Sequence, residues 1–410
     1  MKRPRHFILI LILGALTALG PFSIDMYLPG FPQIARSLEV TTAEVTRSLS
    51  SFFIGLAVGQ LFCGLLMDRF GRKKPLYAGL AIYIAASVGC ALARSVEWLI
   101  ALRFLQALGS SAASVAPVAM VRDLFPVRDS ARVYASLFMV VAASPMLAPT
   151  VGGYLTAIFG WRAVFVVLLA IAALLALAVS LLLPESHRPH PGFSLRLRPI
   201  AANFISVAKE RQFWAYALGG SVAFAGLFAY VAGSPLVFMD LFGLSGKAYG
   251  RIFALLSVGF IGFSQLNAIL LRHYRSEQIV KVALWAQVIV TLILLTGAVG
   301  GWLGLGGTIL LIFLFLAGAG LTNPNTSALS LAPFSRNAGT ASAVMGALQW
   351  GFGSLSSFGI GLFHGRSLVP MAANIAVSSS LGLGIVLVAR RNLAHTLEPE
   401  TAAVTRIKSP

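Results

Sequence analysis

Twelve long apolar runs constrain this chain more than any other feature of its sequence. They begin near Phe7, Val45, Leu76, Trp98, Ala131, Ala163, Phe213, Tyr249, Ile279, Leu305, Ala338 and Ser367. A helix needs about 20 mostly apolar residues to cross roughly 30 Å of hydrocarbon, and each run is about that long. The chain is also 58% hydrophobic and only 11% charged, unlike a soluble globular protein. The sequence therefore predicts an all-α, multi-pass membrane protein with twelve transmembrane helices.

The basic residues are concentrated on one side of the predicted membrane. Loops on the side of the N-terminus carry 23 of the 31 Lys and Arg residues, and loops on the other side carry 7. Because cytoplasmic loops are the basic ones, both termini are expected in the cytoplasm. Topology therefore accounts for the net charge of +18. A nucleic-acid partner would need basic residues gathered on one folded surface, and this pattern predicts no such partner.

One long polar segment, 184–212, divides the predicted spans into six and six. We expect an N-terminal six-helix bundle over 1–183, a central cytoplasmic loop over 184–212, a C-terminal six-helix bundle over 213–390 and a cytoplasmic tail over 391–410. A shift of 207 positions places Pro117 on Pro324 and Pro126 on Pro333, in stretches that lie between corresponding spans of the two halves. This match predicts an internal repeat.

The loop after the second span combines glycine and charge in the run GLLMDRFGRKKPL. It resembles the signature between spans two and three of the major facilitator superfamily, and it matches that signature at Gly64, Asp68, Arg69, Gly71, Arg72 and Lys73. Gly71 permits a tight reversal, and Asp68 is suited to accept hydrogen bonds from the start of a neighbouring helix. The predicted neighbour is Asn337–Ala343, which would make the loop a cytoplasmic gate between the halves. A turn that only fixes topology is the alternative.

The fourth and fifth spans contain two further motifs similar to those of this superfamily. The run LRFLQALGSSAA places Arg103 and Gln106 as in its R-x-x-Q-G pattern, although Gly109 is displaced. The run SPMLAPTVGGYL resembles the proline–glycine motif of the superfamily's antiporters. It matches that motif at Pro149, Gly152 and Gly153. Small residues at this spacing let another helix approach and close a cavity, and ordinary tight packing is the alternative.

One acid and one base lie well inside the predicted spans. Asp25 is about 27 Å along the first span from Phe7, and Arg103 is about 8 Å into the fourth span from the outer side. Both charges are thus expected at one level, paired in a water-filled cavity. Burial favours the neutral form of Asp25 and Arg103 favours the anion, so protonation would respond to whatever enters the site. This predicts a proton-coupling and substrate site. The alternative is that Asp25 only caps an early helix end beside Pro29.

Four further stretches resemble the bicyclomycin/chloramphenicol-resistance (Bcr/CflA) drug exporters. They are SIDMYLPGFP at 23–32, VRDLF at 121–125, AGSPLVF at 232–238 and AGTASAVMGALQ at 338–349. The resemblance implies twelve helices in the two six-helix bundles of the superfamily fold, alternating access, and export of drug-like molecules against inward proton flow. Some such exporters carry a second acid in the first helix. Thr17 and Pro21 stand at those positions here, so Asp25 alone would couple transport to protons.

Polar and aromatic side chains inside the spans suit the wall of a cavity that binds varied ligands. The candidates are Tyr27, Gln106, Phe228, Tyr230, Asn323, Asn325 and Gln349. For each of them, ordinary helix packing is an equal alternative.

Three functions compete at this point. The first is a monomeric proton/drug antiporter of the bacterial inner membrane, which needs no metal or cofactor because the transmembrane proton gradient drives it. The second is a proton-coupled transporter of a metabolite such as an amino acid, nucleoside or sugar. The third is a membrane receptor or enzyme without transport, and the sequence offers it no catalytic or metal-ligand constellation. We therefore predict a transporter.

Overall fold

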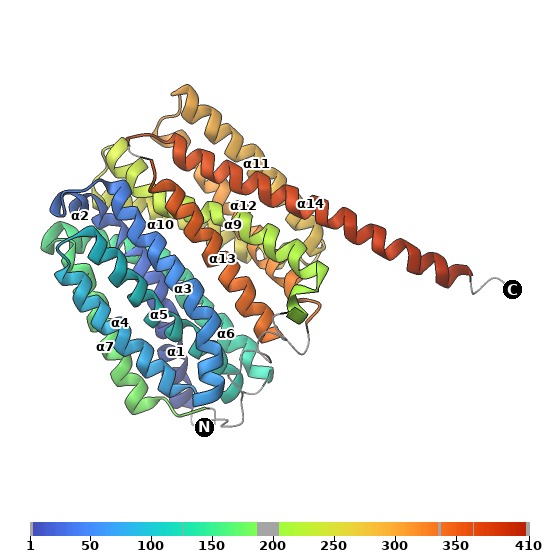
Figure 1. Ribbon diagram of the computed structural model, residues 1–410, viewed down its shortest axis with the longest axis horizontal. Coiled ribbons are helices and arrows are strands. Elements are labelled where there is room, and N and C mark those ends of the chain that lie inside the picture. Colours follow the sequence, from blue (N-terminus) through green and yellow to red (C-terminus); the bar gives the residue numbers. More distant parts are fainter. Residues whose placement is uncertain (1–2, 126, 187–204, 335–337, 364, 407–410) are drawn as a thin grey trace.

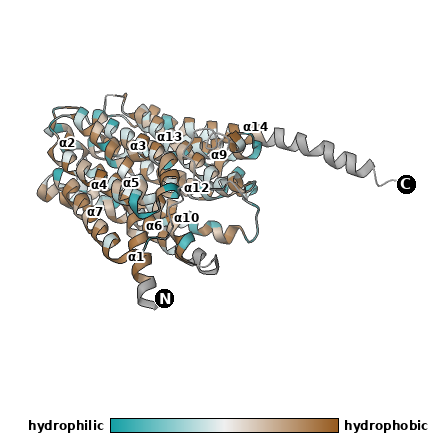
Figure 2. Cartoon of the chain, turned by 60° about the horizontal axis from the view of Figure 1, so that its bottom comes forward, coloured by the Kyte–Doolittle hydropathy of each residue, from teal (hydrophilic) through white to brown (hydrophobic). Residues whose placement is uncertain are grey.

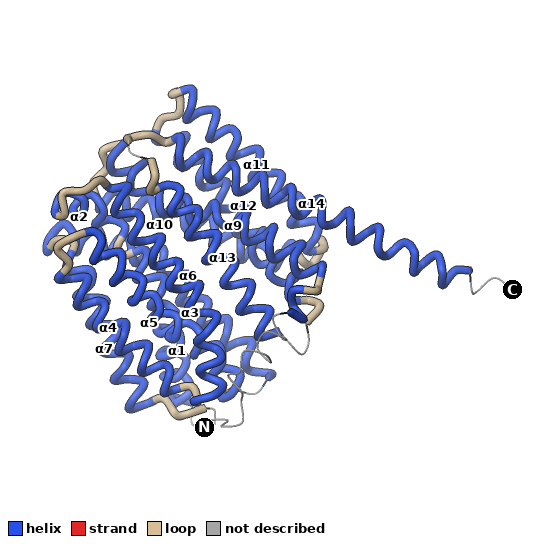
Figure 3. The backbone as a smooth tube through the Cα atoms, in the orientation of Figure 1, coloured by secondary structure: helices blue, strands red, loops and turns tan. Residues whose placement is uncertain are grey.

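The computed structural model describes residues 3–125, 127–186, 205–334, 338–363 and 365–406. These residues form helices joined by short turns, and none of them forms a strand (Figure 3). Eleven of the helical segments described are long and apolar enough to cross a membrane. Apolar residues dominate the bundle, while polar residues concentrate at the helix ends and turns (Figure 2). The prediction of a multi-pass helical membrane protein is confirmed.

The first half of the chain is arranged as a bundle. Its described helices are α1 (Arg3–Asp25), the 3₁₀ turn η1 (Leu28–Gly30), α2 (Phe31–Ser37), α3 (Thr42–Phe70), α4 (Lys73–Leu92), α5 (Val96–Leu124), α6 (Val127–Phe159) and α7 (Arg162–Leu182). Within this half α5 packs on α3 and α4, α1 packs on α5 and α6, and α4 packs on α7.

The second half forms a matching bundle. Its described helices include α9 (Arg211–Pro235), the π-helical turn η2 (Leu236–Leu241), α10 (Gly246–Leu270), α11 (Ser276–Gly300), α12 (Leu305–Leu331), α13 (Ala338–Ile360) and α14 (Val369–Arg406). Pro117 lies inside α5 and Pro324 inside α12, the fourth long helix of each half. This placement agrees with the predicted repeat. The two halves meet where α3 packs on α13 and α6 packs on α10 (Figure 1).

Three of the predicted segments, namely the span from Ala338, the tail and the central loop, are not fully matched by the described helices. The expected span from Ala338 is the helix α13. Because α13 contains many small and polar residues, it is less apolar than the eleven helices counted above, and its crossing of the membrane stays a prediction. The predicted tail from position 391 begins inside α14, which continues to Arg406 and projects beyond the bundle (Figure 1). Most of the predicted central loop, 187–204, lies outside the described residues.

Local sequence signals set the helix boundaries. Thr41 caps α3 with a reciprocal pair of bonds, because its hydroxyl accepts from the Glu44 amide at 3.2 Å and its amide donates to the Glu44 carboxylate at 2.8 Å. Ser95 caps α5 through its side chain in the same position. At the other end of α3 the chain reverses at Gly71, whose φ of 85° strains any residue with a side chain.

Close packing between α4 and α5 depends on glycine. A Cβ atom at Gly109 would lie 2.6 Å from the Tyr83 amide nitrogen on the α4 backbone, and would also meet the Gly79 carbonyl oxygen. The displaced glycine of the fourth-span motif therefore does pack against a helix. Its contact is with backbone, which cannot move aside as a flexible side chain can.

We expect the substitution Gly109→Val to lower the free energy of unfolding by about 1–3 kcal/mol, because overpacking at a helix–helix contact forces the backbones apart. Thermal unfolding of the purified protein in detergent measures this. The matched control is Gly262→Val on α10, where an added Cβ would meet nothing within 4 Å. Equal destabilisation by the two substitutions would contradict the packing role of Gly109.

Candidate functional site

Asp25 is the last residue of α1, and its carboxylate is nearly enclosed at 6% exposure. The α-helix gives way here to a tighter 3₁₀ turn that contains Pro29, whose ring disfavours α geometry in the residue before it. Within the described part of the chain, no hydrogen bond or ion pair reaches the carboxylate. A capping role is disfavoured, since an anion is unfavourable at the C-terminal end of a helix dipole.

The environment of Asp25 includes residues of the second half. Asp25 lies within electrostatic range of the hydroxyl groups of Tyr230 on α9 and Tyr249 on α10. Tyr249 shares a 2.8 Å hydrogen bond with Ser234, whereas the buried Tyr230 hydroxyl has no hydrogen-bond partner among the described residues. Tyr230 stacks on Phe253 with ring centroids 5.4 Å apart. Asp25 therefore lies at the boundary between the two bundles.

Arg103 is completely buried in the first half. Its guanidinium donates to Oε1 of Gln106 at 2.6 Å and to the backbone carbonyl of Ser23 at 3.0 Å. The same group lies 4.0 Å from the centroid of the Phe52 ring and 4.7 Å from that of Tyr27, which are cation–π distances. Gln106 in turn donates to the Ser87 hydroxyl at 2.8 Å.

The expected ion pair between Asp25 and Arg103 does not form in this structure. The last carbonyls of a helix lack intrahelical donors, and Arg103 satisfies one of them at the end of α1. Its positive charge also complements the negative end of the α1 dipole. The sequence correctly placed the two residues at one level, because Ser23 is only two residues from Asp25, but the partner is backbone.

The loop predicted after the second span is only the turn of Gly71 and Arg72, because Gly64, Asp68 and Arg69 belong to α3 and Lys73 begins α4. A charged cluster surrounds this turn. Arg72 donates to Asp68 at 2.7 Å and to Asp123 on α5 at 2.9 Å. The backbone amides of Arg72 and Lys73 donate to the carboxylate of Glu185 at 2.9 and 3.1 Å. Burial alone lowers the pKa of the Arg72 guanidinium, but its hydrogen bonds to the two aspartates raise the pKa by more, so the net shift is upward. Arg72 therefore remains charged in this cluster.

Asp68 is bonded within the first half. Its carboxylate accepts from Arg72, and 41% of its side chain is exposed. Asn337, the start of the predicted partner segment, lies outside the described residues. A Cβ atom at Gly64 would meet nothing within 4 Å, so no helix approaches this glycine here. Arg69 lies beside the Phe70 ring, with 5.9 Å to the centroid. The contact between the halves at this loop stays a prediction.

The proline–glycine motif of α6 lies at the contact between the halves. A Cβ atom at Gly153 would lie 2.6 Å from the Gly246 carbonyl oxygen, and one at Gly250 would lie 2.8 Å from the Pro149 carbonyl oxygen. Gly152 packs directly on the backbone of Met26, in the turn after α1. These small residues hold α6 against both α10 and the turn after Asp25.

The predicted cavity-lining residues fall into two groups. Phe228 joins an aromatic cluster across the interface, with ring centroids 4.8 Å from Phe53 on α3 and 5.2 Å from Trp350 on α13. Gln349 donates to Asn323 at 3.0 Å, and both side chains are half-buried.

Three further candidates are buried inside one half, whereas Tyr230 lies beside Asp25 at the boundary. Asn325 donates to Asn267 at 2.6 Å, Tyr27 is hydrogen-bonded to Ser48 at 2.8 Å, and Gln106 is held by Arg103. These contacts agree with the alternative of ordinary helix packing, although Oδ1 of Asn325 is buried without a hydrogen-bond partner among the described residues.

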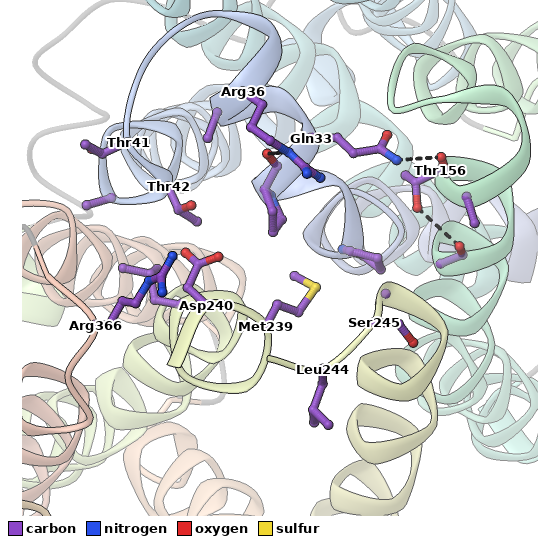
Figure 4. Close-up of a pocket in the computed structure, with 18 of the residues that line it drawn as sticks. Gln33, Arg36, Thr41, Thr42, Thr156, Met239, Asp240, Leu244, Ser245 and Arg366 are labelled. Carbon is purple, nitrogen blue, oxygen red and sulfur yellow. Dashed lines mark hydrogen bonds between the residues drawn. The ribbon is translucent and has the colours of Figure 1, made fainter. Parts of the chain in front are cut away.

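A pocket of about 770 Å³ lies between the halves at the end of the bundle that contains α2. Gln33, Arg36 and Thr42 reach it from the first half, and Asp240 and Arg366 from the second (Figure 4). The Asp240 carboxylate lies between Thr42 and Arg366 in this view. No sequence pattern connects these residues, because they come from segments far apart in the chain that only the fold brings together.

Comparison with protein families gives one match that covers most of the chain. The family model of the Major Facilitator Superfamily matches residues 13–359. The chain is 33% identical over 377 residues to an "uncharacterized MFS-type transporter YdgK" of Bacillus subtilis, covering 91% of this chain and 93% of the relative. It is 32% identical over 353 residues to a "bicyclomycin resistance protein homolog" of Haemophilus influenzae, covering 85% of this chain and 87% of the relative.

A third relative and two solved structures agree with this match. "Multidrug resistance protein D" of Escherichia coli is 29% identical over 354 residues, covering 85% of this chain and 87% of the relative. A D-xylose-proton symporter superposes with a TM-score of 0.74 at 17% identity, covering 93% of this chain and 96% of that one. An inward-facing bacterial homolog of the human lysosomal transporter Spinster superposes with a TM-score of 0.68 at 17% identity, covering 95% of this chain and 96% of that one. At this identity the two structures show the fold alone.

Replacing Arg103 tests its role at the end of α1. We expect Arg103→Met to lower the free energy of unfolding by about 1.5–3 kcal/mol, since buried acceptors lose a charged donor. Backbone amides in 24–31 should also exchange hydrogen faster. The control is Arg162→Met, because Arg162 donates to the Ala93 carbonyl at 3.1 Å but is an exposed residue. Unchanged exchange in 24–31 would contradict the anchoring of α1 by Arg103.

Proposed function

The chain belongs to the Major Facilitator Superfamily, whose members are transporters and not enzymes, and we propose that it is a proton-coupled antiporter. It exports drug-like small molecules from the cytoplasm across the bacterial inner membrane. The relatives named for bicyclomycin and multidrug resistance support this choice of substrate class. Positively charged loops on the side of the termini support the orientation.

One observation carries the proposal: Asp25 is a buried carboxylate at the boundary between the two bundles, and no described residue gives it a hydrogen bond or an ion pair. A charge in such a place is costly, and binding a proton removes the cost. Asp25 is therefore best accommodated as the neutral acid when the halves are packed together as they are here. Loss of the proton would favour a state in which water or a donor reaches the carboxylate.

Tyr230 supplies a donor for that second state. Its hydroxyl is buried, has no partner among the described residues and belongs to the opposite half. A movement of α9 relative to α1 that brings the two groups within hydrogen-bond distance would let Tyr230 donate to the ionised Asp25. Proton release would thus be coupled to movement between the bundles, which alternating access requires.

The aromatic cluster at the same interface fits the proposed substrates. Phe53, Phe228 and Trp350 provide flat apolar surface from both halves, and the Gln349–Asn323 pair adds polar groups nearby. Apolar walls with a few polar groups bind chemically varied ligands.

We expect Asp25→Asn to abolish proton-driven export while leaving downhill substrate movement and expression intact. The amide keeps the size of the side chain but cannot exchange a proton. Export from proteoliposomes and drug resistance of cells measure the loss, and substrate binding to the purified variant measures what remains. The matched control is Asp240→Asn, which removes the other acid near the interface and should retain coupling.

The direction of proton movement separates the two transport mechanisms. A substrate gradient across proteoliposomes should drive protons in the opposite direction, and a pH-sensitive dye reports that flow. Movement of protons with the substrate would indicate symport, as expected of the metabolite alternative, and would refute the antiport proposal. So would full coupling in Asp25→Asn.

The proposal also predicts how the α2 end of the interface responds to added bulk. Gly250→Val should push α10 away from Pro149 and favour opening at this end, because even a single added Cβ at Gly250 would lie too close to the Pro149 carbonyl oxygen. A cysteine introduced by Met239→Cys lines the pocket and reports opening by faster reaction with a membrane-impermeant maleimide. The native Cys63 and Cys90 are buried.

The control for this experiment lies on the same helix. Gly262→Val adds the same bulk where an extra Cβ meets nothing within 4 Å, and should leave the labelling rate of Met239→Cys unchanged. If Gly250→Val does not accelerate labelling, or if both variants do so equally, the glycine contacts at 153 and 250 do not hold this end closed.

A further inference from the structure

A second cavity lies on the outside of the bundle, between the start of α9 and the part of α14 near Ala389. It is a groove of about 640 Å³. Leu218, Leu381 and Val388 give it an apolar wall, and Lys209 and Arg211 lie at its end. Leu381 and Val388 expose more than half of their side chains, in a stretch of α14 long and apolar enough to cross a membrane.

The groove changes from basic to apolar along its length. Lys209 and Arg211 are exposed and lie on either side of Glu210, the N-cap of α9. Trp214 lines the groove next to them, and its indole nitrogen donates to the Ala208 carbonyl at 2.8 Å, which fixes the ring. Basic residues followed by tryptophan and then by aliphatic residues match the layers of headgroup, interface and hydrocarbon in a bilayer.

The acid within this segment does not neutralise the groove. Glu210 is the N-cap of α9, and its carboxylate accepts from the Gln212 amide at 3.4 Å. It is not among the groove-lining residues. The basic end therefore keeps an excess of positive charge, because Lys209 and Arg211 outnumber the single Glu210 between them.

We propose that this groove binds an anionic phospholipid. Its phosphate lies at Lys209 and Arg211, and an acyl chain runs along Leu218, Leu381 and Val388. From Leu381 to Val388 the helix rises about 10 Å, which is long enough to hold several methylene groups. Basic pockets between transmembrane helices are suited to anionic headgroups, since each Lys or Arg near an anionic surface strengthens attraction about fivefold.

Charge decides against the competing occupants. The segment 187–204 precedes the groove in sequence and carries three arginines and no acid, so it would be repelled by Lys209 and Arg211. A second copy of the chain would present the same basic end to its partner. An anionic lipid is complementary to both parts of the groove.

The test is native mass spectrometry of the full-length protein in detergent, with phosphatidylglycerol, with phosphatidylcholine of the same acyl chains, and with glycerol phosphate. We expect retention of phosphatidylglycerol in preference to the other two. The double variant Lys209→Gln, Arg211→Gln should bind it about 25-fold more weakly at low salt. The control double variant Arg272→Gln, Arg275→Gln removes two exposed charges away from the groove and should bind normally.

A second variant blocks the groove without changing its charge. Gly384 lines the groove, and a Cβ there meets nothing within 4 Å, so Gly384→Phe should fold and fill the space for the acyl chain. We expect it to lose phosphatidylglycerol, whereas Gly262→Phe on α10 should retain it. Thermal unfolding verifies that both variants are folded, and Gly384→Leu replaces Gly384→Phe if the larger side chain is not tolerated.

Several results would overturn the proposal. These are equal retention of phosphatidylglycerol and phosphatidylcholine, unchanged binding in the charge variant or in the folded groove variant, and binding of glycerol phosphate as tight as that of the lipid. A photo-crosslinker attached through Gly384→Cys in membranes identifies the occupant directly. Cross-links to lipid support the proposal, and cross-links to 187–204 or to a second copy refute it.

Discussion

The contact between Arg103 and the end of α1 organises the first bundle. A buried guanidinium is costly, and so is a helix that ends inside hydrocarbon with unsatisfied carbonyls. The contact between them lowers both costs, because Arg103 donates to the Ser23 carbonyl and places its charge at the negative end of the helix dipole. Phe52 and Tyr27 cover the guanidinium. The break in α1 is thereby stabilised where membrane helices normally continue.

The break has a consequence for Asp25. Had α1 continued unbroken, the carboxylate would lie on a regular helix face, whereas here it begins a tight turn that packs on Gly152 and faces the second half. Arg103 is already occupied by Ser23 and Gln106. The proposed coupling group therefore has no fixed counter-ion among the residues that the structure describes, and its charge can depend on the position of the bundles.

The sequence predicted the parts of this site that follow from length, spacing and turn chemistry. The apolar runs predicted the positions of the helices, and the helical rise per residue predicted that Asp25 and Arg103 lie at one level. Gly71 indicated the chain reversal after α3, where the structure has a positive φ. The sequence did not predict the partner of Arg103. Ser23 and Asp25 are two residues apart on α1 and therefore point in nearly opposite directions, about 200° apart around the helix axis. Depth alone cannot tell which of Asp25 and the Ser23 carbonyl faces Arg103. The pocket around Asp240 was missed because its residues come from separate turns.

Glycine contacts differ between the two ends of the bundle interface, and this difference bears on alternating access. At the α2 end, Gly152, Gly153 and Gly250 all pack on backbone of another helix or turn. Toward the opposite end, Gly64 on α3 and Gly339 on α13 have open space where a Cβ would be. Glycine costs helix stability, so two helices that carry it without a present contact keep room for a close approach. A transporter that closes first one end and then the other needs such surfaces at both ends.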